Sequence, residues 1–332
     1  MTGPGTETAS RSPARGRTLV AHALPWLITA LCFAYLYRRI AAVAGPEQSP
    51  FGYLADVFAG VPWLQWVALM LPYSLLFLLV DTLVLWRAIS WFNANVPYAS
   101  LLPVRASAYI LSILNEQVGK GAIALFVNRT RGVPGWQVGS SMLFIMFCEF
   151  YYLLSWATLG WALERERLPP AFDAIPWIAA GALLFFAGFV WFFRAARVPF
   201  GARLRERELL HAFRQARPHQ YATIVLLRSP AMLGAFWVYA RAAGLFGVEV
   251  SAAQMVGLLP VIFFSALVPL PGRPGPVVLW ALLFPAYVAQ MTAFGFIQHN
   301  AFVLFNAALG LLFLRRANRQ LFGAVSSDAA SA

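Results

Sequence analysis

The sequence predicts an all-α, polytopic integral membrane protein. Of its 332 residues, 60% are hydrophobic and only 11% are charged, whereas a soluble domain averages about 45–50% apolar and about 25% charged residues. A helix needs about 20 apolar residues to cross the hydrocarbon core of a bilayer. Six segments meet this requirement and are predicted to be full spans: 19–37, 62–86, 136–163, 174–194, 221–246 and 295–314.

Two further apolar stretches, 98–128 and 253–291, are interrupted by glycine and proline. Each is predicted to be either a re-entrant hairpin or a pair of full crossings. Glycine and proline inside a membrane-spanning segment often mark positions where the helix is interrupted. The residues expected to break the backbone are Gly119 and Gly121 in the first stretch and Pro271, Gly272 and Gly275 in the second.

The arginines predict the orientation of the chain. The loop 194–220 holds seven arginines against two glutamates, and both termini add three arginines each, whereas 38–60 is balanced and 164–173 has one more acidic than basic residue. Segments rich in Lys and Arg remain on the cytoplasmic side. We therefore expect a multi-pass protein of the cell (inner) membrane with cytoplasmic N- and C-termini.

This orientation divides the chain into two halves of opposite direction. Residues 1–17 and 317–332 are predicted to be disordered cytoplasmic ends, 18–194 the first membrane half and 221–316 the second. The connection 195–220 is a basic cytoplasmic linker, which carries either an amphipathic helix over 203–217 or a solvated connector. The segment 19–37 is interpreted as an uncleaved first helix rather than a signal peptide, because its apolar run exceeds about 7–15 residues.

The two interrupted stretches resemble each other. Ser112–Lys120 precedes Ser265–Arg273 by 153 positions, with Ser, Leu and Gly coinciding and a cation after the glycine in both. Inverted repeats with broken segments mark the midplane substrate site of many transporters. The pattern favours such a repeat, and chance similarity between two apolar segments is the alternative.

Short motifs in these stretches resemble those of a known family. Gln117–Gly121, followed by Asn128–Pro134, resembles the first block of the lysylphosphatidylglycerol synthase transmembrane region, also called the flippase-like integral membrane family. Pro269–Gly275 resembles the second block. The glutamates of both family motifs are missing here, where Ala122 and Pro276 stand.

The resemblance implies translocation of a phospholipid or lipid-linked anionic substrate, without the soluble aminoacyl-transferring domain of the full synthases. The alternatives are a membrane-embedded transferase acting on a lipid phosphate and a non-transporting scaffold. The expected partners are membrane lipids. No basic-aromatic pattern indicates nucleic acid, and homo-oligomerisation stays open.

Charged residues inside apolar spans are the candidates for substrate binding, because each costs about 2.5–3.5 kcal/mol to insert unless it has a partner or a wet cavity. Glu149 is either a functional carboxylate or a tie between helices. Arg228, just before Pro230, either binds a phosphate, as arginine does well, or extends to the interface. Asp81 is expected to pair with Arg87 or to lie at the interface.

The interrupted stretches supply the other candidates. Polar side chains between apolar flanks in the first stretch either line a cavity or lie in an ordinary loop; they are Asn115, Glu116, Gln117 and Lys120. Arg273, among prolines and glycines, is the cation of the second stretch. Cys32 and Cys148 are isolated and the four histidines are scattered, so no metal or cofactor is expected. No catalytic residue is assigned.

Overall fold

The computed structural model describes residues 14–114, 116–194, 202–267, 270–271 and 274–322. Over these residues the chain is helical, with no strand, and six helices are long and apolar enough to cross a membrane. This confirms the prediction of an all-α polytopic membrane protein. The long helices are α1 (Ala14–Ala44), α3 (Trp63–Phe92), α6 (Gly135–Glu164), α7 (Ile175–Arg194), α10 (Pro218–Leu245) and α13 (Val288–Phe322).

The two interrupted stretches form helical hairpins. The first consists of α4 (Tyr98–Leu114) and α5 (Glu116–Arg131), and the second of α11 (Ala252–Ala266) and α12 (Pro274–Leu283). The longest arm, α4, has 17 residues and is therefore about 26 Å long at 1.5 Å per residue, short of the roughly 30 Å of a hydrocarbon core. All four arms are shorter than the six long helices, which favours re-entrant hairpins over pairs of full crossings.

Short elements connect these helices. They are α2 (Pro50–Ala59), η1 (Arg165–Arg167), η2 (Pro170–Ala174), α8 (Ala202–Arg205), η3 (Glu208–Leu210), α9 (His211–Gln215) and η4 (Pro285–Tyr287). The prediction of one amphipathic helix over 203–217 is therefore wrong, because the described part of the linker is divided among α8, η3 and α9. Phe213 of α9 is buried against Phe144 and Phe189, so this end of the linker packs into the bundle.

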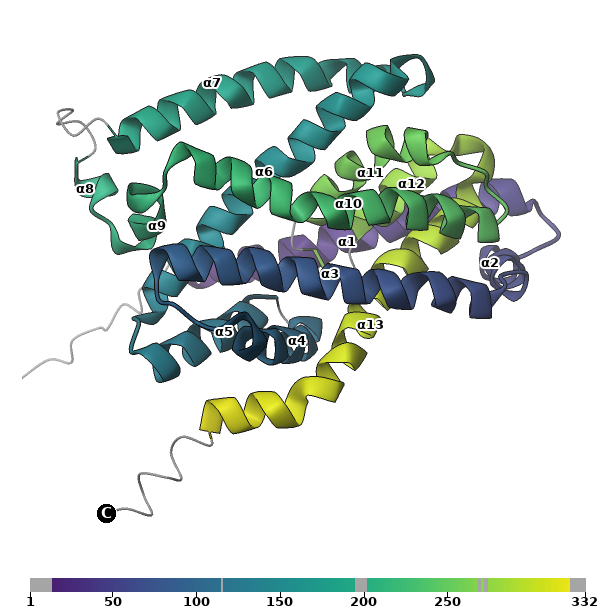
Figure 1. Cartoon of the computed structure of the whole chain (residues 1–332). Helices are drawn as coiled ribbons and strands as arrows, with labels where there is room; N and C mark the ends of the chain where they lie inside the picture. Colours follow the sequence, from purple (N-terminus) through teal and green to yellow (C-terminus); the bar gives the residue numbers. More distant parts are fainter. Residues whose placement is uncertain (1–13, 115, 195–201, 268–269, 272–273, 323–332) are drawn as a thin grey trace, which may run out of the picture.

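The chain forms an inverted repeat. Helices α3 and α10 lie side by side and run in opposite directions (Figure 1). Helix α4 packs on α13, and α11 packs on α6 in the same way. The unit α3–α4–α5–α6 thus corresponds to α10–α11–α12–α13, and the two hairpins lie toward opposite ends of the molecule (Figure 1).

The flanking helices follow the same correspondence. The pair α1 and α2 contacts α13, as α7 and α9 contact α6. Helix α7 thus matches α1 and belongs with the second unit. By this comparison α7 is equivalent to α1, whereas the arginine pattern predicts a first half that extends to residue 194.

Glycines hold the two units together at matching positions. A Cβ atom on Gly160 of α6 would lie 2.3 Å from the Cα atom of Gly257 in α11. A Cβ atom on Gly310 of α13 would lie 2.4 Å from the carbonyl oxygen of Ala106 in α4. Only glycine permits so close an approach of two helix backbones, as at other small-residue crossings in membranes.

Three of the predicted backbone breaks are wrong. Gly119 and Gly121 lie inside α5, and Gly275 lies inside α12. Gly119 is needed for packing, since a Cβ atom there would lie 2.2 Å from Ser112 Oγ across the hairpin. Gly275 faces the equivalent Ser265, with its Cβ position 3.0 Å from the Ser265 carbonyl oxygen. Pro271 does lie between two helices, α11 and α12, and Gly272 lies outside the described residues.

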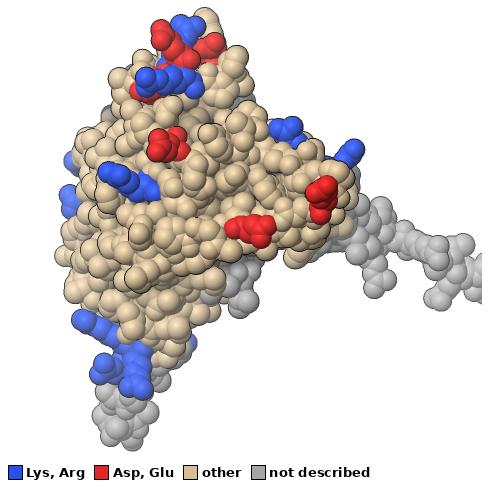
Figure 2. Space-filling model, turned by 90° about the vertical axis from the view of Figure 1, so that its right-hand side faces the viewer, with Lys and Arg blue, Asp and Glu red and all other residues tan. Residues whose placement is uncertain are grey.

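The molecule has two chemically different ends. The end where α3, α5 and α7 finish is called the basic end, because Arg129, Arg131 and Arg194 lie at the ends of α5 and α7. The right-hand side of Figure 1, turned to the viewer in Figure 2, is mostly uncharged. Acidic and basic side chains lie together at the top of Figure 2, and a cluster of basic side chains alone lies at the bottom. The linker with α8 and α9 lies at the left, the basic end (Figure 1).

We expect Gly160→Ala and Gly310→Ala each to lower the free energy of unfolding by about 1–3 kcal/mol, because overpacking forces helix backbones apart. Gly188→Ala on α7 is the matched control, since its Cβ atom would meet nothing within 4 Å. Unfolding in detergent measures the difference. Equal stability of all three variants would contradict the assignment of these crossings.

Candidate functional site

A cavity of about 280 Å³ lies between the two repeat units. Seven helices contribute to its wall: α3, α4, α5, α6, α10, α11 and α13. Toward the basic end the wall is formed by buried Val84 and Met142, and toward the other end by buried Tyr73 and Tyr239. A single chamber therefore joins both units in the interior of the bundle.

The first charged pair in this chamber joins the two units. Arg228 Nη2 on α10 donates to Glu149 Oε1 on α6 at 2.7 Å. The Arg228 side chain is 10% exposed and that of Glu149 is 25% exposed. Tyr152, one turn after Glu149, donates its hydroxyl to the Arg228 carbonyl and lies with its ring 5.9 Å from the guanidinium. Arg228 is thus held inside the bundle and does not extend to the interface.

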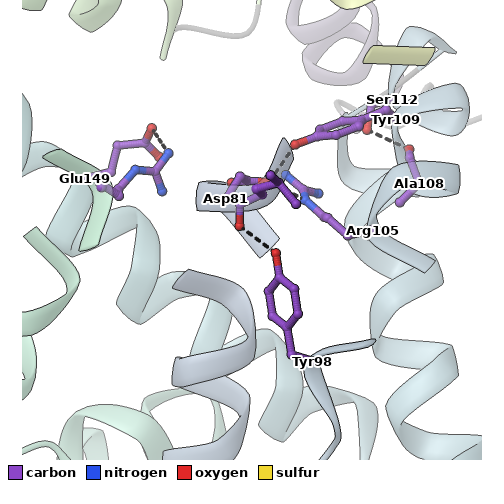
Figure 3. A network of polar contacts seen from close by, with 9 residues as sticks. Asp81, Tyr98, Arg105, Ala108, Tyr109, Ser112 and Glu149 are labelled. Carbon is purple, nitrogen blue, oxygen red and sulfur yellow. Dashed lines mark hydrogen bonds and ion pairs between the residues drawn. The ribbon is translucent and has the colours of Figure 1, made fainter. Parts of the chain in front are cut away.

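The second pair lies within the first unit. Asp81 Oδ2 on α3 accepts hydrogen bonds from Arg105 Nε at 2.5 Å and from the Tyr109 hydroxyl at 2.7 Å (Figure 3). Arg105 and Tyr109 are four residues apart on α4 and so share a helix face. The Arg105 guanidinium also lies 4.6 Å from the centre of the Tyr109 ring. The expectation that Asp81 pairs with Arg87 is wrong, because Arg87 lies over the rings of Trp86 and Trp91.

The two pairs form one electrostatic system. Arg228 interacts by Coulomb attraction with Asp81 as well as with Glu149, and it repels Arg105. In a water-poor interior such interactions are stronger than in water at the same distance. A change of charge at either carboxylate is therefore felt by both arginines.

The pairs lie far from both ends of their helices. At 1.5 Å per residue, Arg228 is about 15 Å along α10 and Glu149 about 21 Å along α6, each counted from the basic end. Asp81 lies about 17 Å before the end of α3. The charged groups therefore occupy the middle of the spanning region, where an unpaired charge is most costly.

Lys120 of α5 also lines this chamber. Its Nζ donates to the thioether sulfur of Met146 at 3.5 Å. The close packing of Gly119 on Ser112 brings the arm that carries Lys120 against α4. Lys120, Glu149 and Arg228 are thus sequence-predicted site residues that share one cavity.

The remaining site residues predicted from the sequence are not among the described residues that line the cavity. Asn115, Gly272 and Arg273 lie outside the described residues, as do the side chains of Glu116 and Gln117 at the start of α5. The Pro271 carbonyl accepts a hydrogen bond from Thr29 Oγ1 at 3.2 Å. Pro271 therefore fixes the second hairpin to α1 and does not itself act at the charged pairs.

Sequence reasoning missed Arg105, Tyr109, His299 and Asn306, which all line the cavity. Arg105 could have been found, because an arginine in an apolar stretch needs a partner at depth. His299 is buried, and its Nε2 accepts the Trp280 indole N–H at 3.1 Å. In the repeat correspondence set by Gly160 and Gly310, His299 stands where Glu149 stands in the first unit, so the two units differ in chemistry.

No family model, curated protein or solved structure matches this chain. Among the described residues, no group of three or more His, Cys, Asp or Glu side chains is close enough to hold a metal ion. The function must therefore be inferred from the cavity itself. Its described groups include guanidinium and hydroxyl donors. Each of these donors binds a carboxylate, and an incoming anion could take the place of that carboxylate.

We expect the Glu149–Arg228 pair to show strong energetic coupling. Removing one member of a buried pair costs about 3–5 kcal/mol, and the partial exposure of Glu149 reduces this to about 2–3 kcal/mol for Arg228→Met. The double variant Glu149→Gln/Arg228→Met should recover most of the loss, because neither charge is then left alone.

Unfolding in detergent measures this double-mutant cycle. Arg165→Met is the control, because its pair with Asp173 is 63% and 54% exposed and should contribute less than about 1 kcal/mol. Strictly additive effects of the Glu149 and Arg228 substitutions would show that the pair is not formed.

Proposed function

We propose that this protein translocates a phospholipid or lipid-linked phosphate between the two leaflets of the cell membrane. The main support for the proposal is the position of two arginines, Arg105 and Arg228. Each binds a carboxylate in a cavity at mid-depth between two inverted units. Buried charges of this kind mark substrate pathways in membrane proteins.

The repeat architecture supports transport. Transporters built from inverted repeats bind substrate at the interface of the repeats, near broken helices, and rock the units to expose the site to either side. Here the two re-entrant hairpins enter from opposite ends and both contribute to the cavity, through Ser112 and Lys120 of the first and Phe263 and Ala266 of the second.

The chemistry of the cavity supports a phosphate-bearing substrate. Guanidinium groups bind phosphate through charge-assisted hydrogen bonds that are stronger than neutral ones. Asp81 and Glu149 occupy the arginines when no phosphate is present, which keeps the cavity from holding an unpaired charge. An incoming phosphate would exchange with these carboxylates.

The exposure of the cavity wall supports a lipid rather than a water-soluble phosphate. Met146 is 43% exposed and Leu267 is 44% exposed, whereas most of the wall is buried. Met146 is about 17 Å along α6 from the basic end, a depth where a side chain meets hydrocarbon. A headgroup could enter beside these residues while its hydrocarbon chains remain in the bilayer.

The charge distribution supports the orientation. Arginines of α5, α7 and the linker gather at the basic end, which we assign to the cytoplasm by the positive-inside rule. The same rule assigns the N-terminal and C-terminal arginines of the sequence to the cytoplasm. The resemblance to the flippase-like family pointed to the same kind of protein.

Lipid movement in proteoliposomes tests this proposal. Purified protein should accelerate the movement of fluorescent phospholipid between leaflets relative to protein-free vesicles. Arg105→Ala and Arg228→Ala should each slow this movement at least about tenfold, because a hydrogen bond to a charged group contributes about 1.5–3 kcal/mol. Arg228→Lys should move lipid at a rate between those of wild type and Arg228→Ala. Lysine keeps the positive charge but lacks the planar guanidinium, which can bind a phosphate through two hydrogen bonds.

Arg87→Ala is the matched control. Arg87 is an exposed arginine on the same helix as Asp81 and lies against tryptophans rather than a carboxylate. It should move lipid at the wild-type rate. If vesicles with wild-type protein move lipid between leaflets no faster than protein-free vesicles, translocation is ruled out. Covalently altered lipid would indicate a transferase instead.

A further inference from the structure

Asn306 carries a buried polar atom that has no partner among the described residues. It lies on α13, is 4% exposed and lines the cavity that holds both charged pairs. Its side-chain oxygen Oδ1 accepts no hydrogen bond from the described part of the chain. Buried amide oxygens are nearly always hydrogen-bonded, so one that is not deserves an explanation.

The packing of α13 on α4 holds Asn306 in the wall of the cavity that also contains the second charged pair. Gly310, one turn later on α13, lies against the Ala106 carbonyl of α4 so closely that no side chain would fit. Ala106 is the neighbour of Arg105, which binds Asp81. Asn306 is therefore held on the same wall as the arginine proposed to bind phosphate.

Three donor groups that line this cavity bind carboxylates. Arg105 Nε and the Tyr109 hydroxyl donate to Asp81, and Arg228 Nη2 donates to Glu149. A donor for Asn306 Oδ1 can come from a molecule that enters the cavity. A phosphate held by the arginines cannot supply it when ionised, because its oxygens only accept.

We propose that Asn306 is a specificity-determining residue that accepts a hydrogen bond from the headgroup of the transported lipid. The substrate is then a phospholipid whose headgroup carries a hydroxyl or N–H donor in addition to its phosphate. Lipids of equal charge that lack such a donor are poor substrates, because binding them leaves Asn306 Oδ1 buried and unpaired. This inference rests on the proposed lipid translocation.

Two pairs of lipids of equal charge test the inference in the same proteoliposomes. Phosphatidylglycerol carries hydroxyl donors and phosphatidylmethanol carries none, and both are anionic. Phosphatidylethanolamine carries N–H donors and phosphatidylcholine carries none, and both are zwitterionic. Wild-type protein should move the donor-bearing member of at least one pair about tenfold faster, corresponding to about 1.4 kcal/mol, and the pair affected identifies the donor.

Asn306→Leu should remove this preference by slowing the donor-bearing lipid to the rate of its donor-free partner. The donor-free lipid should move as before. Asn300→Leu is the matched control, because Asn300 lies on the same helix and donates to the Phe296 carbonyl one turn earlier. It should keep the preference.

The outcomes separate this inference from the proposed function. Wild-type protein that moves no lipid overturns both. Wild-type protein that moves both members of each pair equally fast overturns the inference and leaves translocation standing, whether or not any variant folds. If Asn306→Leu slows all lipids alike, or keeps the preference for the donor-bearing lipid, Asn306 does not select the headgroup.

Discussion

The structure depends on keeping arginine inside the membrane. An isolated guanidinium at mid-depth is costly, and Arg228 is tolerated because Glu149 of the other repeat unit binds it at 2.7 Å. Asp81 does the same for Arg105 within the first unit. Buried ion pairs of this kind contribute little to stability compared with apolar packing. Their retention in an otherwise aromatic and aliphatic bundle is therefore better explained by binding than by folding.

Helix packing places these charges where an inverted-repeat transporter would need them. The glycine crossings of α6 on α11 and of α13 on α4 set the two units at equivalent positions. Each crossing also brings a hairpin against the long helix of the other unit, so that the cavity is lined by both. The units are not chemically equal, since Glu149 in one corresponds to His299 in the other. The proposed headgroup site therefore belongs mainly to α3 and α4, with α6 and α10 completing it.

The sequence predicts the long helices well because apolar length alone decides whether a segment can span. It also predicts that the two interrupted stretches enter and leave on opposite sides, as re-entrant hairpins or as pairs of full crossings, since the arginines fix the ends of the intact spans. It assigns Gly119, Gly121 and Gly275 wrongly, because glycine serves both broken backbone and close helix packing, and only the three-dimensional contacts with Ser112 and Ser265 distinguish these uses. The Asp81–Arg105 pair was missed because its members are 24 residues apart, whereas local spacing suggested Arg87.

The central claim is that the arginines of the cavity bind the phosphate of a lipid. An experimental density map of the protein in a bilayer of phospholipid tests it most directly. We expect a phosphate within hydrogen-bond distance of Arg105 or Arg228, with at least one of Asp81 and Glu149 displaced from its arginine. The lipid chains should leave the cavity beside Met146 and Leu267. A map in which both ion pairs stay closed, and lipid density surrounds the bundle without entering it, would contradict the claim.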